Sequence, residues 1–234
     1  MIKNYIERFL FFPSKELKKF PSNININFED IFLEDNNKKI HGWYINGKND
    51  NDISKNKVIL FFHGNAGNIS FRINYIKNFY ELGFSLLFFD YPGFGLSEGN
   101  PNEYSCVEGG KIFYNYLVNK KNFEKKNIIF YGESIGGAIS SLLANELNIK
   151  YLIVQSTFTD IKLIIKNMVS IDLFNIFTVG FETLNNIKLR NKINTLKKAM
   201  KTLIIHSIDD ELIDVSHAEK LKEYSDELII CEGN

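Results

Sequence analysis

The chain has 234 residues, of which 44% are hydrophobic, so it can bury the core of one large domain. Its 28 Lys and Arg residues balance 28 Asp and Glu residues, and this zero net charge argues against a dedicated nucleic-acid binder. The only two cysteines, Cys106 and Cys231, make no disulfide framework, which favours a reducing, intracellular location.

We expect residues 1–26 to form an N-terminal extension of a main domain at 27–234. No apolar run reaches the ~18 residues that cross a bilayer, and the run Phe9–Phe12 is too short for a signal peptide. One helical face collects Ile2, Tyr5, Ile6 and Phe9. This face either packs on the domain or lies at a membrane interface, so the protein is expected to be cytoplasmic or peripheral on a membrane.

From residue 27 onward, short apolar strands alternate with helical segments. Strands 27–34 and 39–45 predict a hairpin. Six further apolar runs predict strands at 58–63, 85–91, 128–132, 151–156, 202–207 and 227–232. Helices are predicted at 69–82, 103–119, 135–147 and 215–224. The sequence therefore predicts an α/β fold with a doubly wound, mostly parallel, eight-stranded sheet.

The strand at 128–132 ends in the pattern Gly-x-Ser-x-Gly, centred on Ser134, and a helix begins at once. This context predicts a nucleophile elbow. Side chains at Gly132 and Gly136 would collide with neighbouring backbone, so only glycine is tolerated there. The serine is expected in a strained conformation with its hydroxyl above the sheet, where the following helix directs its N–H groups. Ser134 is the predicted nucleophile.

A serine nucleophile needs two N–H groups that stabilise the oxyanion of its reaction intermediate. One is expected from Ile135, the residue after the nucleophile, and the other from the loop HGNAGN that follows strand 58–63, where we expect Asn65. His63 in this loop, and Asp90 at the end of a strand, are expected to be structural.

The segments HGNAGN, DYPGFGLSEG, YGESIGGA and STFTD, in this order and spacing, resemble the α/β-hydrolase superfamily. They are similar above all to its bud-emergence-type subgroup and to related α/β-hydrolase domain-containing depalmitoylases. The resemblance runs from about Asn27 to the last residue. It implies an α/β-hydrolase fold with a short helical lid, and a serine hydrolase that cleaves carboxylic esters or thioesters through an acyl-enzyme. Small esters, lipid acyl esters and S-acylated proteins all fit as substrates, and no metal or organic cofactor is implied.

The resemblance also implies an acidic catalytic residue in the segment IIHSIDDELID, which begins at Ile204. The pattern His-Gly-x-x-Asp-Glu of the family falls on Asp210 and Glu211, with Ser207 in place of the glycine. Asp210 is therefore expected to orient a catalytic histidine and to stabilise its charged form. Asp209 is the alternative.

The family's catalytic histidine follows the last strand, but this chain reads ELIICEGN and reaches Asn234 without one. His217 is the only histidine near Asp210 in the sequence, and the family has a histidine there in addition to its catalytic one. Two interpretations remain open. The domain is incomplete at its C-terminus, which would leave this chain an impaired enzyme, or the protein is a non-catalytic, hydrolase-like binding or scaffold protein at a membrane. The intact elbow favours the first.

An insert at about 159–201 separates two predicted strands. Its first half, 161–181, is very apolar, and forms either a lid suited to an acyl chain or a cover over the core. Its second half, 185–201, carries six basic residues and no acid, which indicates a solvated face or a contact with anionic lipid. The oligomeric state does not follow from the sequence.

Overall fold

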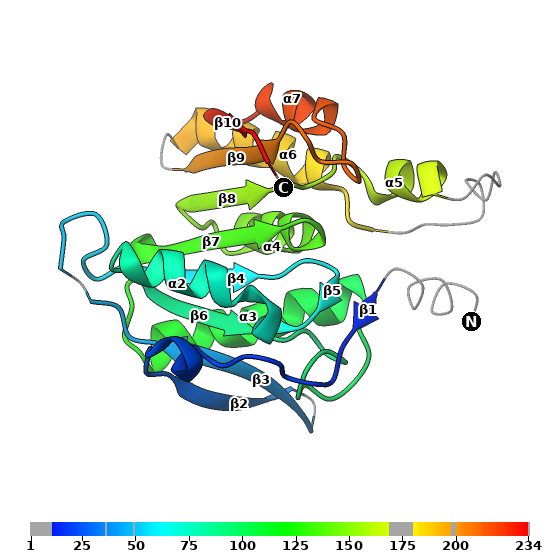
Figure 1. The fold of residues 1–234 in the computed structure, drawn as a ribbon. Helices are drawn as coiled ribbons and strands as arrows, with labels where there is room; N and C mark the ends of the chain where they lie inside the picture. The colour runs from blue at the N-terminus through cyan, green and yellow to red at the C-terminus, as the bar shows by residue number, and fades with distance from the viewer. Residues whose placement is uncertain (1–10, 36, 49, 169–179, 198–199, 234) are drawn as a thin grey trace.

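The computed structural model describes residues 11–35, 37–48, 50–168, 180–197 and 200–233 (Figure 1). The strands are β1 (Phe12–Pro13), β2 (Glu29–Asp35), β3 (Lys38–Ile45), β4 (Val58–Phe62), β5 (Ala66–Gly67), β6 (Ser85–Phe89), β7 (Ile128–Glu133), β8 (Tyr151–Gln155), β9 (Lys201–Ser207) and β10 (Glu227–Cys231). The α-helices are α2 (Ile73–Glu81), α3 (Glu103–Asn119), α4 (Ile135–Glu146), α5 (Ile161–Met168), α6 (Thr183–Lys197) and α7 (Ser216–Lys222). The short 3-10 helices are η1 (Pro21–Ile24), η2 (Ile69–Arg72) and η3 (Lys125–Asn127).

Eight of these strands form the central sheet, in the order β10-β9-β8-β7-β4-β6-β3-β2. β3 is antiparallel to β2 and β6, and the other neighbours are parallel. The predicted eight-stranded, mostly parallel sheet is therefore confirmed. One predicted helix differs from the structure: its first turn, at residues 69–72, is the 3-10 helix η2, and the α-helix begins only at Ile73. The Asn68 side chain caps η2 by accepting a hydrogen bond from the Ser70 N–H.

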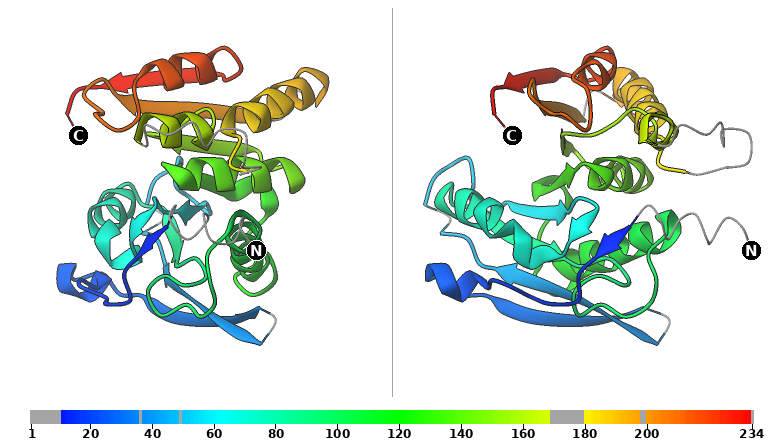
Figure 2. Two further views of the ribbon diagram at one scale, coloured as in Figure 1. Left: turned by 90° about the vertical axis from the view of Figure 1, so that its right-hand side faces the viewer. Right: turned by 45° about the vertical axis from the view of Figure 1, so that its right-hand side comes forward.

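The core lies on both faces of the sheet, with α2 on one face and α3 and α4 on the other (Figure 2). On the α2 face, the register aligns three aromatic rings across β6, β4 and β7. The ring centroid of Phe61 lies 4.4 Å from that of Phe88 and 5.3 Å from that of Tyr131, and both pairs are stacked. Such pairs contribute about 0.5–1.5 kcal/mol beyond their burial, and they hold in place the strand that leads to Ser134.

The described part of the N-terminal extension packs on the domain. β1 pairs with β5, and the buried ring of Phe11 meets the rings of Phe94 and Phe181 edge-on. The predicted amphipathic face between Ile2 and Phe9 lies outside the described residues. The segment from Phe11 to Ser14 thus reaches the loop that follows β4.

α6 packs against α4 and contributes a buried cation. The Arg190 guanidinium donates to the carbonyl of Ile149 at 2.7 Å and to the hydroxyl of Thr202 at 2.9 Å. Burial lowers the pKa of Arg190 to about 10. This basic residue of the insert is therefore neither part of a solvated face nor free to contact lipid, because it ties α6 to the strands.

The β8–β10 end of the sheet is covered unevenly. Leu152, Val154 and Ile204 are buried on one face of the sheet, whereas the side chains next to them along each strand, which point to the opposite face, stay partly exposed. These partly exposed side chains form what we call the β8–β10 strip: Ile153, Leu203, Ile205 and Ile229. Within the ranges that the structure describes, no helix is long and apolar enough to cross a membrane.

Candidate active site

The turn between β7 and α4 holds Ser134 at φ 54° and ψ −120°, a strained conformation for a residue with a side chain. A Cβ at Gly132 would lie 2.4 Å from the Gly136 oxygen, and a Cβ at Gly136 would lie 2.1 Å from the Phe62 oxygen. The steric reason predicted for both glycines is confirmed. The close approach of strand and helix fixes where the serine hydroxyl points.

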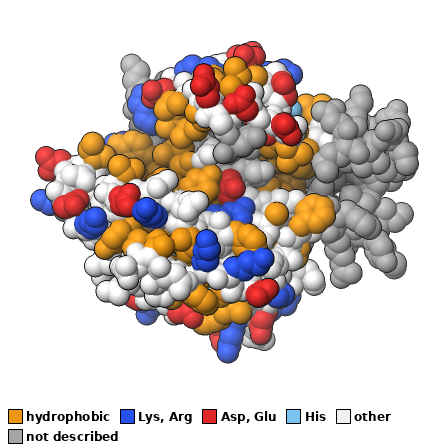
Figure 3. Space-filling view, viewed as in Figure 1, with side chains coloured by type: hydrophobic (Ala, Val, Ile, Leu, Met, Phe, Trp, Pro, Cys, Tyr) orange, Lys and Arg blue, Asp and Glu red, His pale blue; other side chains and the backbone are white. Residues whose placement is uncertain are grey.

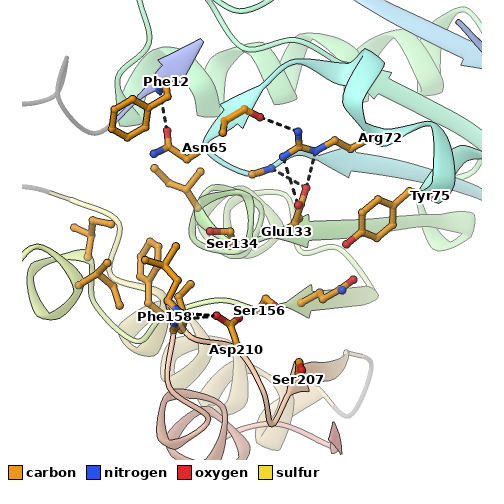
Figure 4. A pocket seen from close by; sticks show the side chains of 18 of the residues that line it. Phe12, Asn65, Arg72, Tyr75, Glu133, Ser134, Ser156, Phe158, Ser207 and Asp210 are labelled. Atoms are coloured by element: carbon orange, nitrogen blue, oxygen red, sulfur yellow. Dashed lines mark hydrogen bonds and ion pairs between the residues drawn. The ribbon is translucent and has the colours of Figure 1, made fainter. Parts of the chain in front are cut away.

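Ser134 opens into a cavity of about 560 Å³ that is also lined by Asn65, Ile135 and Asp210 (Figure 4). The fold therefore brings together all four predicted site residues from three segments: the β7–α4 turn with Ser134 and Ile135, the loop after β4 with Asn65, and the loop after β9 with Asp210. Ile135 is the first residue of α4, so its N–H has no acceptor within the helix. This N–H is available at the cavity.

The loop around Asn65 has its carbonyl groups engaged. The carbonyls of five successive residues, 63–67, accept hydrogen bonds. The donors are, in order, the Tyr91 hydroxyl, the His63 ring, the Phe12 N–H, the Arg72 guanidinium and the Ser14 N–H. The N–H of Gly64 donates to Glu133 at 3.0 Å. By contrast, no described residue accepts a hydrogen bond from the Asn65 N–H. The loop is thus held by its carbonyls, while one amide is left for a ligand.

The two neighbouring aspartates after β9 have different surroundings. Asp210 lines the cavity, and its Oδ1 accepts from the N–H groups of Leu212 at 3.0 Å and Ile213 at 2.9 Å. Asp209 is exposed and accepts from the Gly233 N–H at 2.8 Å. Only Asp210 shares the cavity with Ser134.

His217, considered above as a substitute base, is bound to the loop after β8. Its Nδ1 accepts from the Thr159 N–H at 3.1 Å, and burial is the main cause that lowers its pKa. A triad histidine donates from Nδ1 to its carboxylate. Because the Nδ1 of His217 is an acceptor, the ring lacks the proton that such a bond with Asp210 requires.

The other three of the four histidines are also engaged. His63 donates from Nδ1 to the Gly64 carbonyl, and His206 donates from Nε2 to the Ile213 carbonyl, each at 2.7 Å. His41 bridges Asp30 and the buried Asp90. Among the described residues, no histidine hydrogen bonds to Ser134. The four histidines, all of which lie within the described ranges, therefore supply no base to the serine.

Asp90 and His63 organise the base of the loop, as expected of structural residues. Asp90 is fully buried, and its Oδ1 accepts from the Ile69 N–H at 2.9 Å. The Nε2 of His63 lies 3.7 Å from the same carboxylate. Burial and the nearby Arg72 charge lower the pKa of His63 to about 3, so its ring is neutral at physiological pH.

Two charged residues at the cavity, Arg72 and Glu133, were not predicted from the sequence. Arg72 and Glu133 form an ion pair with an Nε–Oε2 distance of 2.9 Å. Glu133 occupies a variable position of the elbow pattern, and Arg72 lies on a helix of mixed polarity. The available signal was a glutamate placed two residues after the end of the apolar run Ile128–Tyr131, immediately before Ser134.

The cavity has an apolar end and a polar end. The apolar wall consists of Phe12, Phe158, Ile161, Ile164, Leu212 and Ile213. The polar wall includes Arg72, Tyr75, Glu133, Gln155 and Ser207. Two of the apolar residues come from α5, at the beginning of the predicted lid, while residues 169–179 of that insert lie outside the described residues. Ser134 lies between the two ends (Figure 4).

Comparison with known proteins agrees with this geometry. The sequence profile of the alpha/beta hydrolase fold matches residues 57–179, and the chain belongs to this family. It is 32% identical over 152 residues to protein bem46 of Schizosaccharomyces pombe, covering 64% of this chain and 50% of that protein. It is 29% identical over 152 residues to the alpha/beta hydrolase domain-containing protein WAV2 of Arabidopsis thaliana, covering 63% and 48%. These matches confirm the bud-emergence-type subgroup, and the chain spans about half the length of these relatives.

Solved structures show the same fold at low sequence identity. An alpha-beta hydrolase from Vibrio vulnificus aligns with a TM-score of 0.76 at 18% identity, over 99% of this chain and 86% of that chain. An esterase from Pyrococcus furiosus aligns with a TM-score of 0.73 at 17% identity, over 96% and 88%. The predicted α/β-hydrolase fold is confirmed.

Proposed function

We propose that the protein is a serine hydrolase that cleaves carboxylic esters or thioesters through an acyl-enzyme on Ser134. The observation that carries the proposal is the strained serine in a cavity shared with Asn65 and Ile135, whose N–H groups have no acceptor among the described residues. The serine oxygen attacks the acyl carbonyl, and the resulting oxyanion accepts hydrogen bonds from the N–H groups of Asn65 and Ile135. The alcohol or thiol then leaves, and water releases the acid.

In this proposal Asp210 orients an imidazole, which takes the serine proton. None of the four histidines of the chain is bonded in a way that suits this role. We therefore propose that the 234-residue chain is an impaired hydrolase. Loss of the base lowers turnover by several powers of ten, and what remains comes from the oxyanion site and substrate binding.

The apolar end of the cavity supports an acyl chain as the bound group. Phe12 and Leu212 at this end are 59% and 61% exposed, which fits a rim that touches lipid at a membrane surface. The polar end, with Tyr75 and Gln155, would receive the alcohol or thiol. Lipid esters and S-acylated proteins inside the cell are the substrates that this arrangement favours, and small esters are their experimental substitutes.

The test is hydrolysis of 4-nitrophenyl butyrate with and without added imidazole, compared with the Ser134→Ala variant. Free imidazole supplies the general base, so it should raise the rate above its own solution background only when Ser134 is present. A fluorophosphonate probe with imidazole should label the wild-type chain and leave Ser134→Ala unlabelled. If neither reaction depends on Ser134 while a fluorescent fatty acid or anionic lipid vesicles still bind, the alternative of a non-catalytic binding or scaffold protein at a membrane holds instead.

A further inference from the structure

An ion pair links the residue before Ser134 to the residues on either side of Asn65. Glu133 Oε2 lies 2.9 Å from Arg72 Nε and accepts the Gly64 N–H at 3.0 Å. The same guanidinium donates from another nitrogen to the Ala66 carbonyl at 2.7 Å. Figure 4 shows this chain of contacts between β7 and the loop. The pair therefore holds both neighbours of the proposed oxyanion donor.

The direction of these bonds determines how the Asn65 peptide is held. The Gly64 N–H is drawn to the carboxylate and the Ala66 carbonyl to the guanidinium, so the segment between them has little freedom to rotate. Glu133 belongs to the strand that carries the serine. Through this pair, the two proposed oxyanion donors are fixed to the same piece of backbone.

The charges of the pair also matter for the reaction. The side chains of Arg72 and Glu133 are only 10% and 22% exposed, so their interaction is weakly screened. A lone carboxylate in the cavity wall would repel the oxyanion. Arg72 neutralises it while adding a hydrogen bond to the loop. A buried pair is by itself weak evidence for a gain in stability, because apolar replacements are often as stable.

We propose that Arg72 and Glu133 are positioning residues that set the Asn65 N–H for the oxyanion formed at Ser134. This inference rests on the proposed function. The pair acts in the transition state and not in ground-state binding, so its loss should lower kcat and leave KM nearly unchanged.

The experiment measures kcat and KM for 4-nitrophenyl butyrate, with saturating imidazole, for Glu133→Ala, Glu133→Gln and Arg72→Lys. Removing an oxyanion donor costs roughly 100- to 1000-fold in kcat, so displacing one should cost about 10- to 100-fold in Glu133→Ala. Glu133→Gln keeps an oxygen for the Gly64 N–H and should recover part of the loss. Rates of all variants, Ser134→Ala included, are divided by the concentration of folded protein measured by circular dichroism, so that a smaller folded fraction is not mistaken for slower chemistry.

The matched control is Glu81→Gln, which breaks the exposed Lys77–Glu81 pair on α2 and should leave both constants unchanged. A kcat of Glu133→Ala within twofold of wild type, with Ser134→Ala inactive, overturns the positioning role alone. An equal fall in Glu81→Gln also overturns it. A Ser134→Ala variant as fast as wild type overturns the proposed function, and the inference with it.

Discussion

The carboxylates of Asp209 and Asp210 differ in what they bind, although the residues are adjacent in the chain. Asp210 is held by two backbone N–H groups at the cavity, and Asp209 by the Gly233 N–H at the surface. Two backbone donors hold the Asp210 carboxylate in one orientation at the cavity, which suits a residue that orients an imidazole.

We predict that Asp210→Asn lowers the imidazole-supported rate by roughly 100-fold or more, as expected of a triad carboxylate. Asp209→Asn should change this rate less than about twofold, because its carboxylate lies outside the cavity. Both variants are compared by kcat/KM for the same ester and by thermal unfolding. The reverse ranking would assign the acidic role to Asp209.

Gly136→Ala should destabilise the protein by at least about 1–3 kcal/mol, because its new Cβ would lie 2.1 Å from the Phe62 oxygen. The control is Gly109→Ala in α3, where the nearest atom would be 3.6 Å away. That change should be neutral or stabilise by up to about 1 kcal/mol, since alanine favours the helix. Urea unfolding of both variants measures the difference, and equal midpoints would contradict the steric argument.

The loop after β4 should respond to pH through His63. The pKa of this histidine is about 3 in the folded chain, below its ordinary value of about 6.5 in an unfolded one. Between these values only the unfolded state binds the proton, so the free energy of unfolding falls as pH decreases, by up to about 1.4 kcal/mol per unit. His63→Asn should flatten this dependence in urea titrations between pH 6 and 4. An unchanged slope would mean that other groups cause it.

Among the elements, the buried strands were the most predictable from sequence. Continuous apolar runs such as Val58–Phe62 and Ser85–Phe89 occur where a parallel sheet is covered on both faces, and their bounds moved by only one or two residues. The elbow was predictable because its glycines and serine are adjacent in the chain. The Arg72–Glu133 pair was not, since its partners are 61 residues apart and meet only in the folded loop.

α6 shows the same limit. A run of basic residues indicates a solvated helix on average, but the Arg190 guanidinium donates to the carbonyls of Ile149 and Lys150 in the loop between α4 and β8. We predict that Arg190→Met destabilises the protein by about 2–4 kcal/mol, because it leaves buried carbonyls without donors. Lys192→Met, an exposed change on the same helix, should stay within about 0.5 kcal/mol. Guanidinium unfolding separates the two, and similar losses would argue against the buried anchor.

For the whole molecule, uneven cover of the sheet predicts self-association. Parallel strands normally have both faces covered, whereas the β8–β10 strip is partly open to solvent (Figure 3 shows one face of the molecule, with its apolar patches in orange). The 234-residue chain should therefore bind a hydrophobic dye and aggregate at high concentration. Ile229→Lys should reduce both effects, and Ile53→Lys, at an isolated exposed site, should not. Light scattering and dye fluorescence report the outcome; no difference between these variants would exclude the strip as the cause.

The pairing of β1 with β5 connects Phe12 and Pro13 to the proposed site, whose other members lie far along the sequence. The N–H of Phe12 bonds to the carbonyl and to the side chain of Asn65, so a load applied ahead of Phe11 is transmitted to the peptide that is proposed to hold the oxyanion. An affinity tag, a fluorophore or an attachment to a solid support at that end would therefore change the rate of reaction at Ser134. The rate of acyl transfer at Ser134 should therefore depend on any force that displaces Phe12, because the two hydrogen bonds from Phe12 hold the Asn65 peptide.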